Sequence, residues 1–131
     1  MSTVNYAKQI KDMLCGYKNI DYVFLFGSIL GKPLVNSDVD ILIGGHLDHS
    51  ERTNLAMELE LVLKRKVDVV LQNEASCEII LKAFSKGKAV LINDKERLKK
   101  DYFRNFYLYD DTSSLRHLRM LRIKRRHSNG G

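Results

Sequence analysis

Two aspartates with one residue between them stand at the head of an apolar segment, and a third aspartate lies in a later one. Asp38 and Asp40 open the stretch DVDILI, and Asp68 interrupts KVDVVLQ. Residues two apart in a strand face the same side, about 6.6–7 Å apart. Neighbouring carboxylates repel each other unless a cation lies between them. Because oxygen ligands suit Mg²⁺ or Mn²⁺, the three acids predict a two-metal site for phosphoryl transfer.

Each aspartate also has a purely structural explanation. Asp38 follows PLVNS and is typical of a turn. Asp68 would equally suit an exposed strand position, or an ion pair with one of the basic residues at 64–66. All three acids together, in this order and behind a Gly-Ser pair, favour the metal site, where each would be both catalytic and metal-ligating.

Gly27 and Ser28 end the apolar segment that precedes the acids. A strand that ends in a Gly-Ser turn and enters a helix exposes free backbone N–H groups. Those groups and the Ser28 hydroxyl can bind a phosphate chain, although Ser28 would also serve as a helix cap. Ser37, next to Asp38, completes the predicted nucleotide-binding residues.

The remaining pattern predicts a small α/β or α+β domain of order α-β-β-α-β-α-β-α-α. Gly87 is predicted to end the third helix, and Ser50 or Thr53 to cap the second. The expected helices cover residues 3–17, 50–66, 74–87 and, in two parts broken near 109–114, 94–127; the expected strands cover 21–26, 38–43, 66–72 and 89–93.

Length and charge limit the class of protein. The chain of 131 residues predicts one domain over 1–127, with a flexible tail at 128–131. The net charge of +6 comes entirely from residues 112–131, because residues 1–111 hold 16 basic and 16 acidic residues. A basic C-terminal helix suggests an acidic partner; direct nucleic-acid binding through it is a less favoured alternative.

The cysteines and the hydropathy pattern predict a cytoplasmic protein. Cys15 and Cys77 lack the spacing of a disulfide framework or zinc site, so reduced thiols packed in the core are expected. No apolar run is long enough to cross a bilayer, and the first residues lack the apolar core of a secretory signal. A membrane partner is therefore not expected.

The motif resembles the minimal nucleotidyltransferases of the DNA polymerase β superfamily. Their hallmark is a Gly-Ser at the end of the first strand, then Asp-x-Asp on the next strand and a third Asp on a later one. Residues 85–122 also look like the C-terminal part of MntA-type antitoxins. The pattern departs from these antitoxins in having nine rather than ten residues between Ser28 and Asp38, and Ile29 and Leu30 where an Arg is common.

The resemblance implies the nucleotidyltransferase fold, a small mixed sheet of about four strands flanked by helices, with C-terminal helices. It also implies a cytoplasmic antitoxin that transfers AMP from ATP to a tyrosine of a cognate HEPN-domain ribonuclease toxin. Asp38 and Asp40 would hold two Mg²⁺ ions, Gly27 and Ser28 the β and γ phosphates, and Asp68 the metal beside the acceptor hydroxyl. Two alternatives remain: a non-catalytic antitoxin that masks its toxin, and an enzyme with a small-molecule acceptor.

Overall fold

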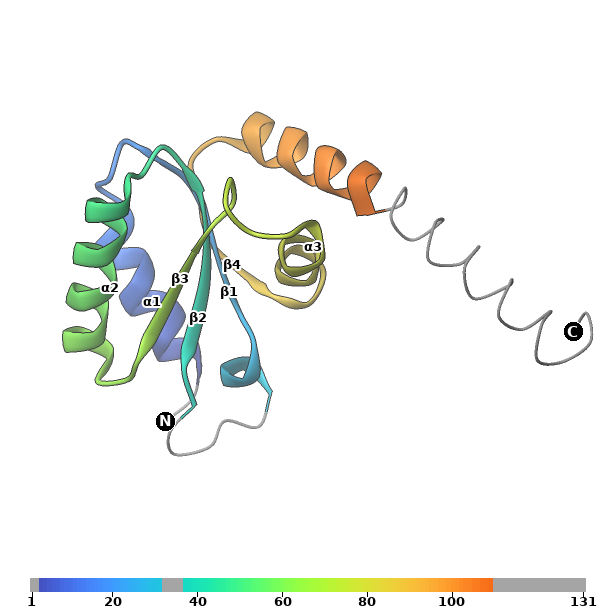
Figure 1. The fold of residues 1–131 in the computed structure, drawn as a ribbon. Coiled ribbons are helices and arrows are strands. Elements are labelled where there is room, and N and C mark those ends of the chain that lie inside the picture. Colours follow the sequence, from blue (N-terminus) through green and yellow to red (C-terminus); the bar gives the residue numbers. More distant parts are fainter. Residues whose placement is uncertain (1–2, 32–36, 110–131) are drawn as a thin grey trace, which may run out of the picture.

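A four-stranded mixed sheet lies between two layers of helices (Figure 1). The computed structural model describes residues 3–31 and 37–109. The strand order is β3-β2-β1-β4, in which β1 is antiparallel to both neighbours and β2 and β3 are parallel. The elements are α1 (Thr3–Leu14), β1 (Ile20–Phe26), the 3₁₀ turn η1 (Ser28–Leu30), β2 (Val39–Gly45), α2 (His49–Leu63), β3 (Val67–Leu71), α3 (Cys77–Lys86), β4 (Lys88–Ile92) and a helix over 95–109.

The two central strands explain the apolar runs of the sequence. β1 and β2 are covered on both faces, and five of the seven residues in each are buried. Such strands are almost continuously apolar, because both faces meet packed side chains. The expected α/β fold with a small mixed sheet is confirmed in the described residues.

Alternation along each strand divides the core into two parts. Ile41 and Ile43 point to the layer of α1 and α2, where they join the larger hydrophobic cluster. Leu42 points to the other face and packs with Tyr22, Phe24 and residues of α3. Both faces of the central strands are thus packed with apolar side chains. Polar functional groups on the face of α3 are expected only where its helices do not cover the sheet.

Asp48, and not Ser50 or Thr53, caps α2. Its carboxylate accepts a hydrogen bond from the backbone N–H of Glu51 at 2.8 Å, and the Glu51 side chain accepts one from the Asp48 N–H at 3.2 Å. This reciprocal capping box satisfies two otherwise unpaired donors, so the helix begins earlier than expected. The prediction of Ser50 or Thr53 as the cap is wrong.

Gly87 ends α3 as expected, but its backbone is extended and not left-handed. A Cβ atom on Gly87 would lie 2.2 Å from the carbonyl oxygen of Ala83 and 2.8 Å from that of Leu25. Close approach of two backbones therefore requires glycine here.

Both cysteines are free, as expected, but neither is packed in the core. Cys15 is exposed and Cys77 is half-buried. They lie at the exposed end of α1 and in the first turn of α3, respectively, so the prediction of core-packed thiols is wrong.

A buried polar network fastens the helix at 95–109 to the sheet. The Tyr22 hydroxyl donates a hydrogen bond of 2.8 Å to Asp101, which is 2% exposed. Arg97 donates to both oxygens of Asp101 at 3.1 Å and lies 3.7 Å from the Asp21 carboxylate. Buried charges are stable only when paired in this way, so the network fixes the position of the helix.

The predicted second part of the C-terminal helices, the break near 109–114 and the flexible tail at 128–131 lie outside the described residues, apart from Tyr109. One domain over 1–127 stays a prediction. In the ranges that are described, no helix has the length and hydropathy needed to span a bilayer.

Candidate active site

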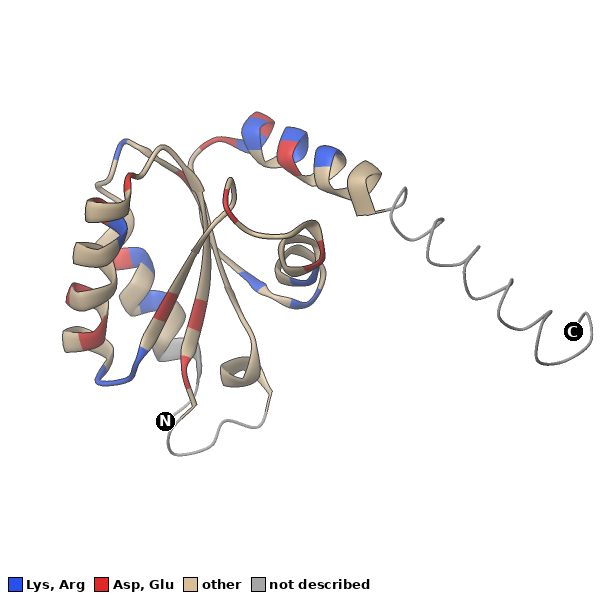
Figure 2. Cartoon of the chain, viewed as in Figure 1, with Lys and Arg blue, Asp and Glu red and all other residues tan. Residues whose placement is uncertain are grey.

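The parallel pair β2 and β3 brings two of the three predicted acids side by side. Asp40 and Asp68 are partners in the strand register, which gives them the same face of the sheet. They share this face with Leu42 and Val70, two residues further along, which pack under α3. Figure 2 shows the acidic segments of β2 and β3 next to each other at the end of the sheet near η1. The helices of the second layer, α3 and the helix at 95–109, do not extend over this end of the sheet (Figure 1).

The surroundings of the two carboxylates differ. Asp40 is half-buried on a central strand, whereas Asp68 is exposed because β3 is at the edge of the sheet. Within the ranges the structure describes, neither carboxylate has a hydrogen bond or an ion pair. Asp68 is therefore an exposed strand residue, as one alternative supposed, but it does not pair with the basic residues at 64–66.

Gly27 lies directly against the Asp40 carboxylate. Phe26, the last residue of β1, is the register partner of Asp40, so the turn that follows passes beside that side chain. Gly27 has a φ of +89°, and a Cβ atom built on it would lie 2.3 Å from Oδ2 of Asp40. Both the backbone conformation and the close approach require glycine. The Gly of the motif thus gives the carboxylate room at the end of the strand.

The turn η1 presents Ser28 and buries Ile29. Ser28 is exposed at the first position of the turn, where the backbone N–H groups have no partner inside the turn. Ile29 is fully buried and belongs to the larger hydrophobic cluster, which anchors the turn to the sheet. The structure therefore explains why an apolar residue stands at position 29.

Asp38 precedes β2, and hydrogen bonds to the segment between α2 and β3 fix the backbone on either side of it. The Val39 N–H donates to the Lys66 carbonyl at 2.8 Å. The Ser37 carbonyl accepts a hydrogen bond of 3.0 Å from Arg65. Arg65 in turn donates to the Tyr6 hydroxyl at 2.7 Å and lies over the Tyr6 ring. Asp38 is thus placed by the packed layer of α1 and α2.

Arg65 and Tyr6 are positioning residues that the sequence did not reveal. Arg65 lies between two lysines, and the sequence suggests for it only an ion pair with Asp68. Its role depends on Tyr6, 59 residues away, being brought beside it by the packing of α1. No local pattern marks such a pair.

The three acids interact electrostatically at Asp40. Burial raises the pKa of the Asp40 carboxyl above its usual value, and the negative charges of Asp68 and Asp38 raise it further. Within residues 3–31 and 37–109, no three Asp, Glu, His or Cys side chains converge into a complete metal-ligand set. The donors are nevertheless oxygen atoms that no cationic side chain of the described residues pairs, which is the chemistry that Mg²⁺ or Mn²⁺ requires. The residues therefore fit a hard divalent cation that water and nucleotide phosphates would help to coordinate.

This pKa shift predicts how the metal-free protein responds to pH. Because the folded state holds the Asp40 proton more tightly than the unfolded state, stability should fall as pH rises from about 4, the usual carboxyl pKa, through the raised value. Above the raised pKa the penalty should be constant. Thermal unfolding of wild type and Asp40→Asn between pH 4 and 7, without divalent metal, measures it. Their difference in Tm should grow with pH, and a difference independent of pH would contradict the prediction.

The fold and the arrangement of acids and Gly-Ser turn define a nucleotidyltransferase, and residues 8–96 match the family model described as "Polymerase beta, Nucleotidyltransferase". The chain belongs to this family. No curated protein matches it significantly.

Solved structures of toxin–antitoxin complexes share the fold. A chain of a toxin–antitoxin crystal structure with AMP-PNP is 24% identical, with a TM-score of 0.73, and the match covers 91% of this chain and 98% of that one. A chain of the MntA–HepT toxin–antitoxin structure is 22% identical, with a TM-score of 0.69 and coverage of 93% and 98%. The same identity and TM-score are found for a complex of a tri-AMPylated Shewanella oneidensis HEPN toxin with an MNT antitoxin, with coverage of 94% and 98%.

Proposed function

We propose that this protein is a metal-dependent nucleotidyltransferase antitoxin that transfers AMP from ATP to a tyrosine hydroxyl of a cognate HEPN toxin. The observation that carries the proposal is the pairing of Asp40 with Asp68 on adjacent strands, with Gly27 against Asp40. The solved toxin–antitoxin structures support the choice of donor and partner, because one contains AMP-PNP and another an AMPylated HEPN toxin. A cytoplasmic location belongs to the proposal.

Each of the predicted site residues would have a separate role, according to its strand. Gly27 and Ser28, at the end of β1, would bind the β and γ phosphates through backbone N–H groups and a hydroxyl. Ser37 would contact the same nucleotide. Asp38, Asp40 and Asp68 would hold Mg²⁺ or Mn²⁺, which would neutralise phosphate charge and lower the pKa of the acceptor hydroxyl.

The acceptor would approach from the side of β3. In the strand order, β1 with its phosphate-binding turn and β3 with Asp68 flank β2, which carries Asp40. In-line displacement needs the nucleophile and the leaving group on opposite sides of the α-phosphate. The acceptor oxygen would then bond to the α-phosphorus, pyrophosphate would leave over Gly27 and Ser28, and Asp68 would accept the proton. Because a tyrosine hydroxyl has a pKa of about 10, it loses its proton more readily than a serine.

Calorimetry with ATP tests the metal part of the proposal. ATP should bind at least about tenfold more tightly with Mg²⁺ than with excess chelator, because the phosphates complete the coordination that the three acids begin. Asp68→Asn should reduce this difference. Equal affinity in the presence and absence of metal would contradict the predicted site.

Transfer of a labelled α-phosphate from ATP to the cognate HEPN-domain toxin tests the reaction. Label in the toxin is the expected result, and inhibition of the toxin without label would favour the masking alternative. Label in small molecules and not in the toxin would favour the alternative of an enzyme with a small-molecule acceptor.

A further inference from the structure

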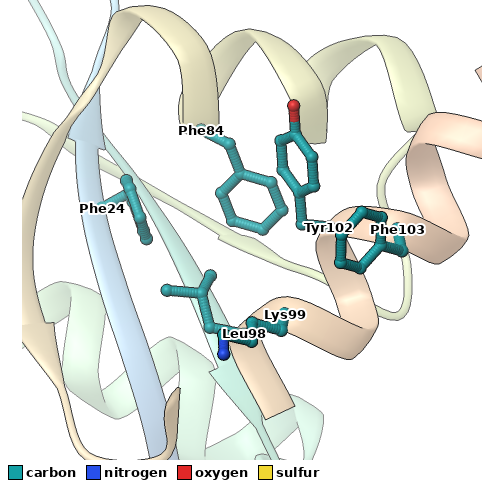
Figure 3. Close-up of a pocket in the computed structure, with 6 residues that line it drawn as sticks. All are labelled: Phe24, Phe84, Leu98, Lys99, Tyr102 and Phe103. Carbon is teal, nitrogen blue, oxygen red and sulfur yellow. The ribbon is translucent and has the colours of Figure 1, made fainter. Parts of the chain in front are cut away.

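An apolar groove lies on the second face of the sheet, apart from the acids. It has a volume of about 490 Å³ and is lined by Phe24, Phe84, Leu98, Lys99, Tyr102 and Phe103. Figure 3 shows that the lining side chains come from β1, α3 and the helix at 95–109, and that Phe84 and Tyr102 lie next to each other across the groove. Their ring centroids are 6.0 Å apart. None of these residues belongs to the predicted catalytic set.

The aromatic surface continues along the helix beyond the groove. Tyr102 is 40% exposed, Phe103 54%, Phe106 46% and Tyr107 66%. Adjacent rings contact each other from Phe84 through to Tyr107, so they form one continuous surface. Contiguous exposed aromatic side chains of this kind mark sites where another molecule binds.

The helix presents this surface in a fixed position. The network of Tyr22, Asp101, Arg97 and Asp21 attaches its buried side to β1. Asn105 is also buried and donates to the Asp101 carbonyl at 2.7 Å. A surface held in this way loses little conformational entropy when a partner binds.

Charge indicates what kind of partner fits. Residues 82–109 supply five of the six residues that line the groove, including Lys99. This segment contains eight Lys and Arg and three Asp and Glu, whereas residues 1–81 contain eight and eleven. Figure 2 shows the basic residues along the helix that lines the groove. A second copy of this chain would bring the same basic rim against itself, and its own segment 112–131 carries six basic residues and no acid. Complementarity therefore favours a partner with acidic residues around an apolar contact.

The ring geometry favours a protein over RNA. Tyr102 and Phe103 meet at 82° and Phe106 and Tyr107 at 73°, whereas Tyr102 and Phe106 are nearly parallel at 14°. Single-stranded nucleic acid binds to ring faces on which successive bases stack. Because two of these three pairs are edge-to-face, the apolar surface is ridged, and a ridged surface accommodates protein side chains better than stacked bases.

We propose that the groove and the aromatic residues of 102–107 form the docking site for the HEPN toxin, which inserts an apolar segment flanked by acidic side chains. The identity of the partner rests on the proposed function. Docking and transfer are then performed by different residues. Variants in the groove should raise the KM for the toxin and leave kcat at saturating toxin unchanged.

Phe103→Ala and Tyr107→Ala test the proposal, with Leu61→Ala as the matched control. Leu61 is 80% exposed on α2, so its truncation removes an exposed apolar side chain elsewhere. Calorimetry with the cognate HEPN-domain toxin should show a loss of affinity of about tenfold or more for each groove variant. The control should stay within about twofold, and all variants should bind Mg²⁺-ATP like wild type.

A charge reversal tests the acidic rim. Lys99→Glu should weaken toxin binding and reduce its dependence on salt, because it places a negative charge beside acidic side chains of the partner. Unchanged salt dependence would contradict the proposal that acidic side chains of the toxin flank the apolar contact.

Other outcomes separate this proposal from the proposed function. Wild-type affinity in both groove variants, with AMP transfer intact, would overturn the docking site and leave the function standing. Failure of the wild-type protein to bind or modify the toxin would overturn both. Two further outcomes would also overturn the proposal. Self-association of the wild-type protein that the groove variants abolish would assign the surface to a second copy of this chain. Binding of a single-stranded RNA that the groove variants abolish would assign it to RNA.

Discussion

Asp40→Asn should reduce AMP transfer on the order of a thousandfold while the protein stays folded. The substitution removes the half-buried carboxylate at the centre of the predicted site, and with it the charge that opposes Asp68 and Asp38. Because it relieves repulsion, Tm without divalent metal should be unchanged or higher. Transfer of labelled AMP and thermal unfolding of the same preparation measure the two effects.

Asp12→Asn is the matched control for this variant. Asp12 is exposed on α1. The Cys15 thiol donates a hydrogen bond to the backbone carbonyl of Asp12, and the substitution keeps that carbonyl. Transfer by this variant should equal that of wild type. A large loss of stability in metal-free Asp40→Asn would make Asp40 a structural residue and contradict the account.

Gly27→Ala should have the second largest effect, and it should act on stability and activity together. The new methyl group would meet Oδ2 of Asp40, and alanine is strained at a φ of +89°. A loss of about 1–3 kcal/mol in the free energy of unfolding is expected, with weaker Mg²⁺-dependent binding of ATP because Asp40 must move. Chemical denaturation and calorimetry measure these effects.

Two further variants separate the collision from backbone strain. Gly16→Ala is the control, because its methyl group would meet nothing within 4 Å, and it should leave stability nearly unchanged. Combining Gly27→Ala with Asp40→Gly removes the atom that the methyl group meets. The double variant should be more stable than the sum of the two single effects predicts. Strict additivity would mean that Gly27 does not contact Asp40 in solution.

The sequence predicted the parts of the molecule that depend on local pattern. The alternation in DVDILI and KVDVVLQ predicted acids from adjacent strands on one face of the sheet, because side-chain direction in a strand follows from its period of two. The structure pairs Asp40 with Asp68, whereas Asp38 lies just before β2 and, contrary to expectation, is not part of the strand. The order of strands and helices followed from the apolar periodicity. Local competition was harder to predict: Asp48 caps α2 because Glu51 completes a capping box with it, although Ser50 and Thr53 lie nearby.

Features built from distant segments could not be predicted in the same way. Arg65 positions the backbone beside Asp38 only because α1 brings Tyr6 to it. The aromatic groove joins β1 to a helix some 75–80 residues later in the chain, and its basic rim is hidden in a sum of charges that is zero over residues 1–111. Neither feature has a signature in one stretch of sequence.

The intact mass of the toxin tests the central claim most directly. After incubation with this protein, ATP and Mg²⁺, the mass of the cognate HEPN-domain toxin should rise by whole AMP units on a tyrosine, and its ribonuclease activity should fall in step. A phosphodiester charge next to an RNA-binding cleft would repel the substrate. With Asp38→Asn in place of wild type, the mass should not change. Full inhibition by that variant without any mass increase would contradict the account, because the antitoxin would then act by masking alone.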